Sequence, residues 1–174
     1  MSGSYTQTSP HIQPLLTSLL RPAAIAESVT SHALTSGFRH IDSAHAYRNE
    51  APTASALLTS PLPRSQLFYT SKVPPRFINY ADAKRCISES LERTGLEYID
   101  LYLLHAPYGG PEGRIGAWKA LVEAVAEGKV RSIGVSNFGV EHLEELEGWM
   151  KVSRTLFSST CLDEVGIRAA GMTY

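Results

Sequence analysis

Four side chains at or near the ends of successive strand-like stretches could together carry out proton transfer. Asp42 ends an apolar stretch, and Tyr47 follows it by five residues in a turn-like segment. Lys72 and His105 stand at the ends of the next two strand-like stretches. A carboxylate, a phenol, an ammonium and an imidazole are complementary acids and bases, so a shared location would make a proton-transfer site.

The phenol of Tyr47 is a slow proton donor and acceptor at neutral pH, because a free tyrosine has a pKa near 10. A lysine ammonium about 4 Å away contributes roughly 4 kcal/mol at an effective dielectric constant of 20, which lowers that pKa by up to about three units. We therefore expect Lys72 to lower the pKa of Tyr47 and Asp42 to keep the buried ammonium charged. His105 would then hydrogen-bond to a small carbonyl compound and orient it.

Each of these residues taken singly has a simpler explanation. A lone Asp or Lys at the end of a strand is more often a cap or a solvated group, Tyr47 could serve packing, and His105 could be a core histidine. Packing demands alone do not readily place four complementary groups at equivalent ends of consecutive units. The joint placement therefore favours the functional interpretation.

Short apolar stretches alternate with helical segments at steps of roughly 30 residues, the size of a β/α unit. Such stretches predict strands of a parallel sheet. The expected strands are Phe38 to Asp42, Leu67 to Lys72, Ile99 to His105 and Val130 to Ser136. The expected helices are Ala23 to Thr35, Glu50 to Leu58, one capped by Asn79 and stopped by Gly95, one ending at Gly128, and Val140 to Met150. In the last helix, Leu143, Leu146 and Met150 should face inward, and the glutamates should face water: Glu141, Glu144, Glu145 and Glu147.

Alternating strands and helices leave two architectures, an open doubly wound sheet or a closed eightfold barrel. In a barrel every strand delivers its last residues to one mouth, whereas an open sheet spreads them along an edge. The ends of the predicted strands carry the polar residues Asp42, Lys72, His105 and Ser136. We therefore predict an α/β fold of the (β/α)8 TIM-barrel type. A full barrel takes about 250 residues, so 174 residues predict an incomplete one with about the first five β/α units.

The composition argues against several other classes of protein. The net charge is −1 and Lys and Arg form no cluster, so we expect the chain not to bind nucleic acid or a membrane surface. Cys86 and Cys161 suit neither a disulfide framework nor a metal site, so we expect no metal and a cytoplasmic setting. The apolar runs fall short of the ~18 residues of a membrane span. No glycine-rich phosphate loop of the Rossmann or P-loop kind is present.

Four motifs resemble the aldo-keto reductase family. They are GFRHIDSAHAYRNE (37–50), TSKVPP (70–75), DLYLLHAP (100–107) and RSIGVSNFG (131–139). The resemblance implies an eight-stranded β/α barrel that reduces an aldehyde or ketone to an alcohol with NADP(H), or runs the reverse oxidation. The implied partner is therefore a small-molecule carbonyl compound or alcohol.

The resemblance also implies catalytic roles. Tyr47 would be the general acid, and Lys72 and Asp42 would tune it. His105 would bind the substrate and orient its carbonyl group.

The cofactor-binding residues implied by the resemblance are Asp42, Ser136 and Asn137. Asp42 would lie near the nicotinamide ribose, and Ser136 with Asn137 would hold the nicotinamide carboxamide. The residues alone leave open that Ser136 or Asn137 merely caps the following helix.

The resemblance divides the chain into a poorly matched segment 1–22, a partial barrel 23–150 and an unrelated or irregular tail 151–174. The glycine-rich first strand of the family is hard to find in His11 to Leu20, and three further strands are missing. An opened barrel would expose an apolar lining and a bare sheet edge, so we expect self-association through that edge. The alternative function is a truncated, catalytically inactive remnant or a partner-binding, regulatory protein.

Overall fold

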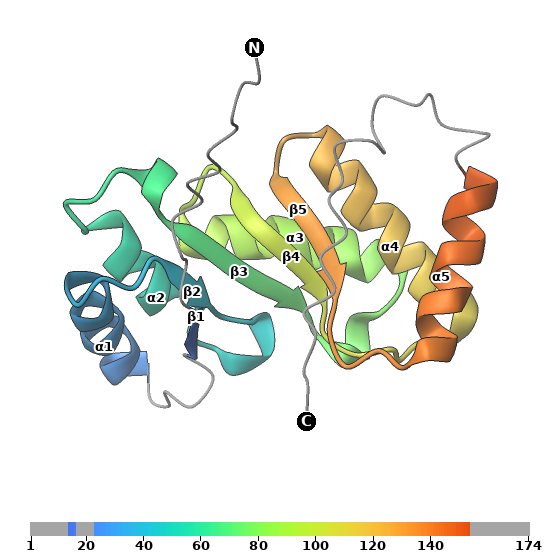
Figure 1. Ribbon diagram of the computed structural model, residues 1–174, viewed down its shortest axis with the longest axis horizontal. Helices are drawn as coiled ribbons and strands as arrows, with labels where there is room; N and C mark the ends of the chain where they lie inside the picture. The colour runs from blue at the N-terminus through green and yellow to red at the C-terminus, as the bar shows by residue number, and fades with distance from the viewer. Residues whose placement is uncertain (1–13, 17–22, 154–174) are drawn as a thin grey trace, which may run out of the picture.

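The computed structural model describes residues 14–16 and 23–153, which form one parallel sheet with helices packed against it (Figure 1). The strands lie in the sheet in chain order. They are β1 Pro14–Leu16, β2 His40–Asp42, β3 Phe68–Val73, β4 Ile99–Leu104 and β5 Val130–Val135. The helices are α1 Ala23–Thr35, α2 Glu50–Leu58, α3 Tyr80–Thr94, α4 Gly110–Ala126 and α5 Val140–Ser153, with short 3-10 helices η1 His45–Tyr47, η2 Arg64–Gln66 and η3 Pro75–Phe77.

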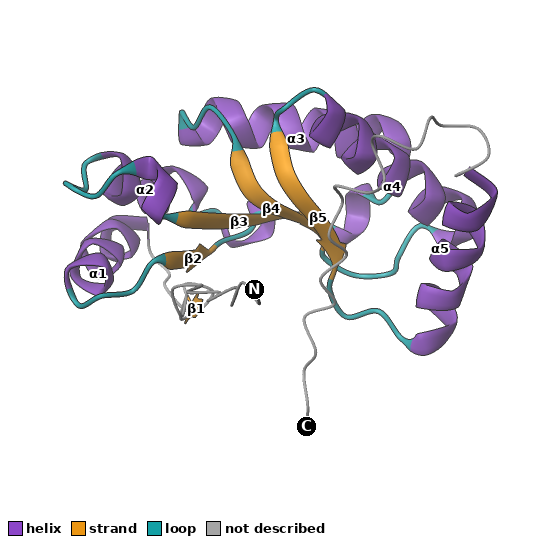
Figure 2. Ribbon diagram, turned by 45° about the horizontal axis from the view of Figure 1, so that its top comes forward, coloured by secondary structure: helices purple, strands orange, loops and turns teal. Residues whose placement is uncertain are grey.

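The order of the strands decides between the two predicted architectures. A doubly wound sheet reverses its strand order and carries helices on both faces. Here each strand pairs in parallel with the next, and α2, α3 and α4 lie on one side of the curved sheet (Figure 2). This is the arrangement of a β/α barrel, and the described residues supply five of its strands.

The first strand lies in a segment where the sequence gives little sign of one. Pro14–Leu16 pairs with β2, with Leu16 opposite Asp42. At the other end, α5 continues past Met150 to Ser153. The rest of the predicted N-terminal segment, and the predicted tail from residue 154 onward, lie outside the described residues.

The carboxyl ends of the strands differ slightly from the prediction. Val73 rather than Lys72 ends β3, and His105 and Ser136 directly follow β4 and β5. Both residues remain aligned with the sheet: the N–H of His105 donates to the oxygen of Val73 at 3.2 Å, and the N–H of Ser136 donates to the oxygen of Leu104 at 2.8 Å. Neighbouring strand ends are therefore held together at one edge.

Strand β2 begins later than predicted because its expected first residue closes helix α1. Gly37 has a left-handed φ of 99°, and its N–H donates to the oxygen of Leu34 at 3.2 Å. The N–H of Phe38 donates to the oxygen of Ala33 at 3.0 Å. The last carbonyls of a helix need such donors, so Phe38 belongs to the end of the helix.

Helix α3 has the predicted cap at each end. The side chain of Asn79 accepts a hydrogen bond from the N–H of Asp82 at 2.9 Å. Gly95 adopts a left-handed φ of 68°, and its N–H donates to the oxygen of Leu91 at 2.9 Å. The buried Ile87 joins the core between this helix and the sheet.

Helix α5 shows two differences from its predicted pattern. Leu146 is buried as expected, but Leu143 is 40% exposed. Glu145 does not simply face water: its two carboxylate oxygens accept hydrogen bonds from Nε and Nη2 of Arg114 at 2.9 and 2.6 Å. Arg114 is a buried residue of α4, and a buried guanidinium needs an anionic partner.

Candidate active site

Lys72 lies near the carboxyl end of β3 and contacts the end of the preceding strand. Its Nζ donates to Oδ1 of Asp42, and to the backbone oxygen of Ser43 at 2.8 Å. Burial lowers the pKa of the Lys72 ammonium, and the charge of Asp42 opposes that change. The two oxygen acceptors therefore stabilise a cation in a site that is otherwise poorly hydrated.

The turn η1 brings Tyr47 next to the residue that follows β4. The Tyr47 hydroxyl lies 3.4 Å from Nε2 of His105, and the two rings meet edge to face with centroids 5.5 Å apart. The Nζ of Lys72 lies 5.0 Å from the centroid of the Tyr47 ring. Together with the bond from Lys72 to Asp42, these contacts bring all four predicted side chains into one cluster.

The pKa of Tyr47 shifts in the direction opposite to our expectation. Burial raises the pKa of this phenol, and the charge of Asp42 raises it further. Lys72 does not reverse this shift, because its ammonium lies over the ring and is bonded to Asp42 and Ser43. The predicted lowering of the Tyr47 pKa was therefore wrong, and Tyr47 holds its proton at neutral pH.

The environment of His105 fixes its charge and its tautomer. Burial, and then the charge of Lys72, lower the pKa of the imidazole from its ordinary 6.5, so the ring is neutral at neutral pH. Its Nδ1 is buried without a hydrogen-bond partner among the described residues, whereas Nε2 faces Tyr47. A buried N–H without an acceptor is rarer than a bare lone pair, so we place the proton on Nε2. His105 can then donate toward a carbonyl oxygen beside Tyr47.

The pair that follows β5 supports the position of His105. Asn137 has a left-handed φ of 60°, and its Nδ2 donates to the backbone oxygen of His105 at 2.8 Å and to Oγ of Ser136 at 3.0 Å. This side chain therefore connects the ends of β4 and β5. The sequence suggested a cofactor contact or a helix cap for Asn137, and did not suggest this link.

Strand β3 holds the segment between β2 and α2 from both faces of the sheet. Successive side chains of a strand point to opposite faces. Lys72 binds Asp42 and the backbone of Ser43 on one face. Ser71, the preceding residue, donates from its hydroxyl to Oε1 of Glu50 at 2.6 Å on the other.

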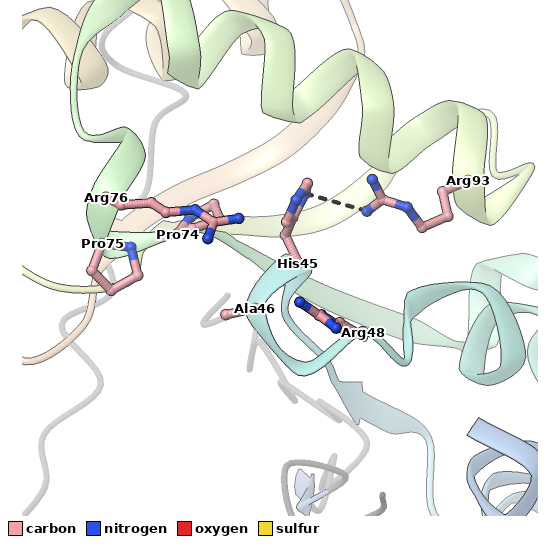
Figure 3. A pocket seen from close by; sticks show the side chains of 7 residues that line it. All are labelled: His45, Ala46, Arg48, Pro74, Pro75, Arg76 and Arg93. Carbon is pink, nitrogen blue, oxygen red and sulfur yellow. Dashed lines mark hydrogen bonds between the residues drawn. The ribbon is translucent and has the colours of Figure 1, made fainter. Parts of the chain in front are cut away.

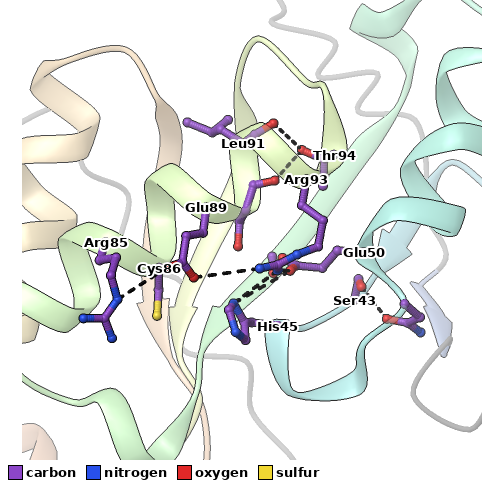
Figure 4. A network of polar contacts seen from close by, with 12 residues as sticks. Ser43, His45, Glu50, Arg85, Cys86, Glu89, Leu91, Arg93 and Thr94 are labelled. Carbon is purple, nitrogen blue, oxygen red and sulfur yellow. Dashed lines mark hydrogen bonds and ion pairs between the residues drawn. The ribbon is translucent and has the colours of Figure 1, made fainter.

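Glu50 is the charged residue that the sequence reasoning missed. Its side chain is fully buried, and Arg93 reaches across from α3 to pair with Oε2 (Figure 4). At the start of the same turn, the Ser43 hydroxyl donates to Oδ1 of Asn49 at 2.7 Å. These contacts fix the residues on either side of Tyr47. A glutamate in the first turn of a helix usually indicates a solvated charge, so the sequence held no clear signal for this pair.

A cavity of about 490 Å³ opens beside η1 (Figure 3). Tyr47 is not among its lining residues, because its side chain turns toward His105 instead. The lining residues are His45, Ala46, Arg48, Pro74, Pro75, Arg76 and Arg93. None of the four clustered residues lines this cavity.

Over residues 14–16 and 23–153, no group of His, Cys, Asp and Glu side chains is arranged to hold a metal ion. In the same part of the chain, no helix combines the length and the apolar character needed to cross a membrane. Cys86 is a buried free thiol.

The strand order defines a β/α-barrel segment, and a cluster of acidic and basic side chains lies at one edge of its sheet. The model of the aldo/keto reductase family matches residues 22–162, and the chain belongs to this family.

Individual relatives agree with this assignment. An aldo-keto reductase of Mycolicibacterium vanbaalenii is 41% identical over 125 residues, which cover 72% of this chain and 45% of that protein. An NAD/NADP-dependent indole-3-acetaldehyde reductase of Schizosaccharomyces pombe is 46% identical over 125 residues, covering 70% and 43%. The crystal structure of an aldo/keto reductase from Brucella melitensis matches with a TM-score of 0.73 at 35% identity, covering 75% of this chain and 51% of that one. The chain thus spans less than half the length of these two curated relatives.

Proposed function

We propose that this chain carries the proton-transfer site of an NADP(H)-dependent oxidoreductase that reduces an aldehyde or ketone to an alcohol, or runs the reverse oxidation. The contact of Tyr47 with His105, beside the Lys72–Asp42 pair, is the observation that carries the proposal. Family membership supports the reaction class, and the relative named as NAD/NADP-dependent supports a nicotinamide cofactor. The preference for NADP(H) follows from the resemblance of the motifs. A cytoplasmic location is also proposed, supported by the free thiol of Cys86.

The proposed chemistry uses each side chain of the cluster once. A carbonyl oxygen that accepts a hydrogen bond from Nε2 of His105 also lies near the Tyr47 hydroxyl, because those two groups are 3.4 Å apart. Tyr47 transfers its proton to that oxygen as the carbonyl carbon is reduced, and a phenolate remains. The ammonium of Lys72, 5.0 Å from the centroid of the Tyr47 ring, offsets only part of the cost of the buried phenolate, and Asp42 keeps the ammonium charged. The raised pKa of Tyr47 keeps the phenol protonated at neutral pH, which is the form that a general acid needs.

The residues at the ends of β2 and β5 fit a nicotinamide nucleotide. A hydroxyl and a carboxamide, from Ser136 and Asn137, complement the carboxamide of the ring, and the Asp42 carboxylate suits ribose hydroxyls. The hydrogen bond from Asn137 to the backbone oxygen of His105 supports this assignment, because His105 is the residue proposed to orient the substrate. Bound NADPH supplies the hydride that adds to the carbonyl carbon.

A cofactor-binding and turnover assay tests the proposal. We expect the purified chain to quench NADPH fluorescence and to oxidise NADPH with an activated aromatic aldehyde. Tyr47→Phe should lower the turnover about 10²- to 10⁴-fold, because it removes the acidic hydroxyl, while cofactor binding persists. Tyr108→Phe is the matched control, because Tyr108 is 63% exposed, and it should leave both unchanged. Undiminished turnover in Tyr47→Phe would refute the assigned role.

The alternative function is a catalytically inactive, partner-binding or regulatory protein. Among the described strands β5 pairs only with β4, so its other edge offers backbone groups to a further strand. This alternative predicts self-association in sedimentation experiments and no NADPH binding at millimolar concentration.

A further inference from the structure

The cavity beside η1 has an arginine on each of two sides. Arg48 directly follows η1, and Arg76 lies in η3 after strand β3. Figure 3 shows His45 and Ala46 between them. Arg48 has a left-handed φ of 56°, and its N–H donates to the oxygen of His45 at 3.3 Å. The side chain of Arg48 therefore projects from a defined turn.

The positive charge of this cavity is only partly compensated. Arg93 also lines the cavity, but it is paired with Glu50. Arg48 forms no ion pair with any described residue, and the guanidinium of Arg76 stacks on the ring of Phe77, 4.6 Å from its centroid. None of the residues lining the cavity within the described ranges is acidic. Two exposed cations thus face one hollow without a counter-charge.

His45 lies between Arg48 and Arg76 and is affected by two of the arginines that line the cavity. Burial lowers the pKa of His45, and the charges of Arg93 and Arg76 lower it further, while Glu50 and Glu89 oppose the change. His45 is therefore neutral at neutral pH and can hydrogen-bond to an anion without repelling it. The surroundings favour a negative ligand on both electrostatic and hydrogen-bonding grounds.

We propose that this cavity binds an oxyanion, a phosphate or carboxylate group held between Arg48 and Arg76, at a site separate from the Tyr47 cluster. Guanidinium groups bind both kinds of oxyanion through forked pairs of hydrogen bonds. A volume of about 490 Å³ also admits the organic part of a small phosphate ester or dicarboxylate. The bound anion joins η1 to η3, and so ties the turn that carries Tyr47 to the loop after β3.

A nuclear magnetic resonance titration tests this proposal without any need for turnover. The isotope-labelled 174-residue chain is titrated with inorganic phosphate and, in parallel, with succinate at constant ionic strength. We expect saturable shifts at the backbone amides of Ala46, Arg48 and Arg76. The tighter of the two probes tells whether phosphate or carboxylate is the preferred group. The reductase proposal is tested separately, by the NADPH-binding and turnover assay.

Charge-neutral variants locate the site. Arg48→Gln and Arg76→Gln should each weaken binding about tenfold, the effect of losing a charged hydrogen bond, and the double variant should abolish it. Arg48→Lys should give an intermediate affinity, because it keeps the charge but loses the fork. Lys119→Gln on α4 removes the same charge away from the cavity and should leave the affinity unchanged.

The same titration can overturn the proposal. The proposal would be overturned if the chemical-shift changes rose linearly with the probe concentration into tens of millimolar, or if they centred on other residues. Equal weakening by Lys119→Gln would overturn it too, because it would indicate general attraction by net charge. Should a Gln variant lose its dispersed spectrum, the wild-type shifts and Arg48→Lys still decide the question.

Discussion

The β2–β3–β4 edge and the β4–β5 edge of the sheet are built differently. At the first, Lys72 is buried between Asp42 and the Ser43 carbonyl, and Glu50 is buried between Ser71 and a helix arginine. At the second, Ser136 and Asn137 are partly or largely exposed. Their described link to the first edge is the hydrogen bond from Asn137 to the residue that follows β4.

This difference indicates which polar side chains the fold itself holds in position. A buried polar group is costly unless its partners are present, so the first edge is held in one arrangement by the fold itself. Exposed polar groups can exchange water for a ligand at little cost. The fold itself thus positions the groups proposed for proton transfer, whereas the proposed nicotinamide contacts stay open to solvent.

The largest effect on stability should come from breaking the buried pair at the first edge. Arg93→Met leaves the fully buried carboxylate of Glu50 without its cation, and we expect a loss of about 2–3 kcal/mol in the free energy of unfolding. Urea denaturation measures it. Arg85→Met on the same helix is the control: Arg85 is 52% exposed, so the loss should stay within about 0.5 kcal/mol. Equal losses of unfolding free energy in Arg93→Met and Arg85→Met would contradict the special role of the buried pair at the first edge.

A smaller effect should follow from changes at the second edge. Asn137→Ala removes the amide contacts and places alanine at a φ of 60°, which should cost about 1 kcal/mol. Asn137→Gly keeps the backbone conformation accessible and should cost less. The same urea measurement applies. A loss for Asn137→Ala as large as that for Arg93→Met would show that the two edges are equally fixed.

At neutral pH the least apparent effect is a dependence of stability on pH, which develops only on acidification. Burial lowers the pKa of His40, His45 and His105 below 6.5, so the unfolded chain binds more protons as the pH falls through 6.5. Their contribution is present above that pH and is lost on acidification, with a slope below about 1.4 kcal/mol per pH unit for each histidine. Urea unfolding between about pH 8 and pH 5 measures this slope. His105→Gln should reduce it, and an unchanged slope would contradict the prediction.

Features with a local signal could be predicted from the sequence. Asn79 and Gly95 mark the ends of α3 because capping and left-handed closure depend on residues close in the chain. The meeting of Tyr47 with His105 also followed, because parallel strands deliver their carboxyl ends to one edge.

Features that depend on distant partners could not be predicted. Glu50 and Glu145 look like ordinary helix glutamates, yet their arginines come from other helices, 43 and 31 residues away in the chain. The pKa of Tyr47 was missed for a related reason. Proximity of Lys72 could be inferred, but the position of its ammonium over the ring, and its commitment to other oxygens, could not.

The alternation of Ser71 and Lys72 along β3 couples strand alignment to reactivity. Sliding this strand by a single residue would turn the ammonium toward the helices and send the hydroxyl to the mouth. A mispaired sheet would then lack the cation proposed to assist catalysis. A turnover measurement would consequently report whether β3 is paired in the correct register.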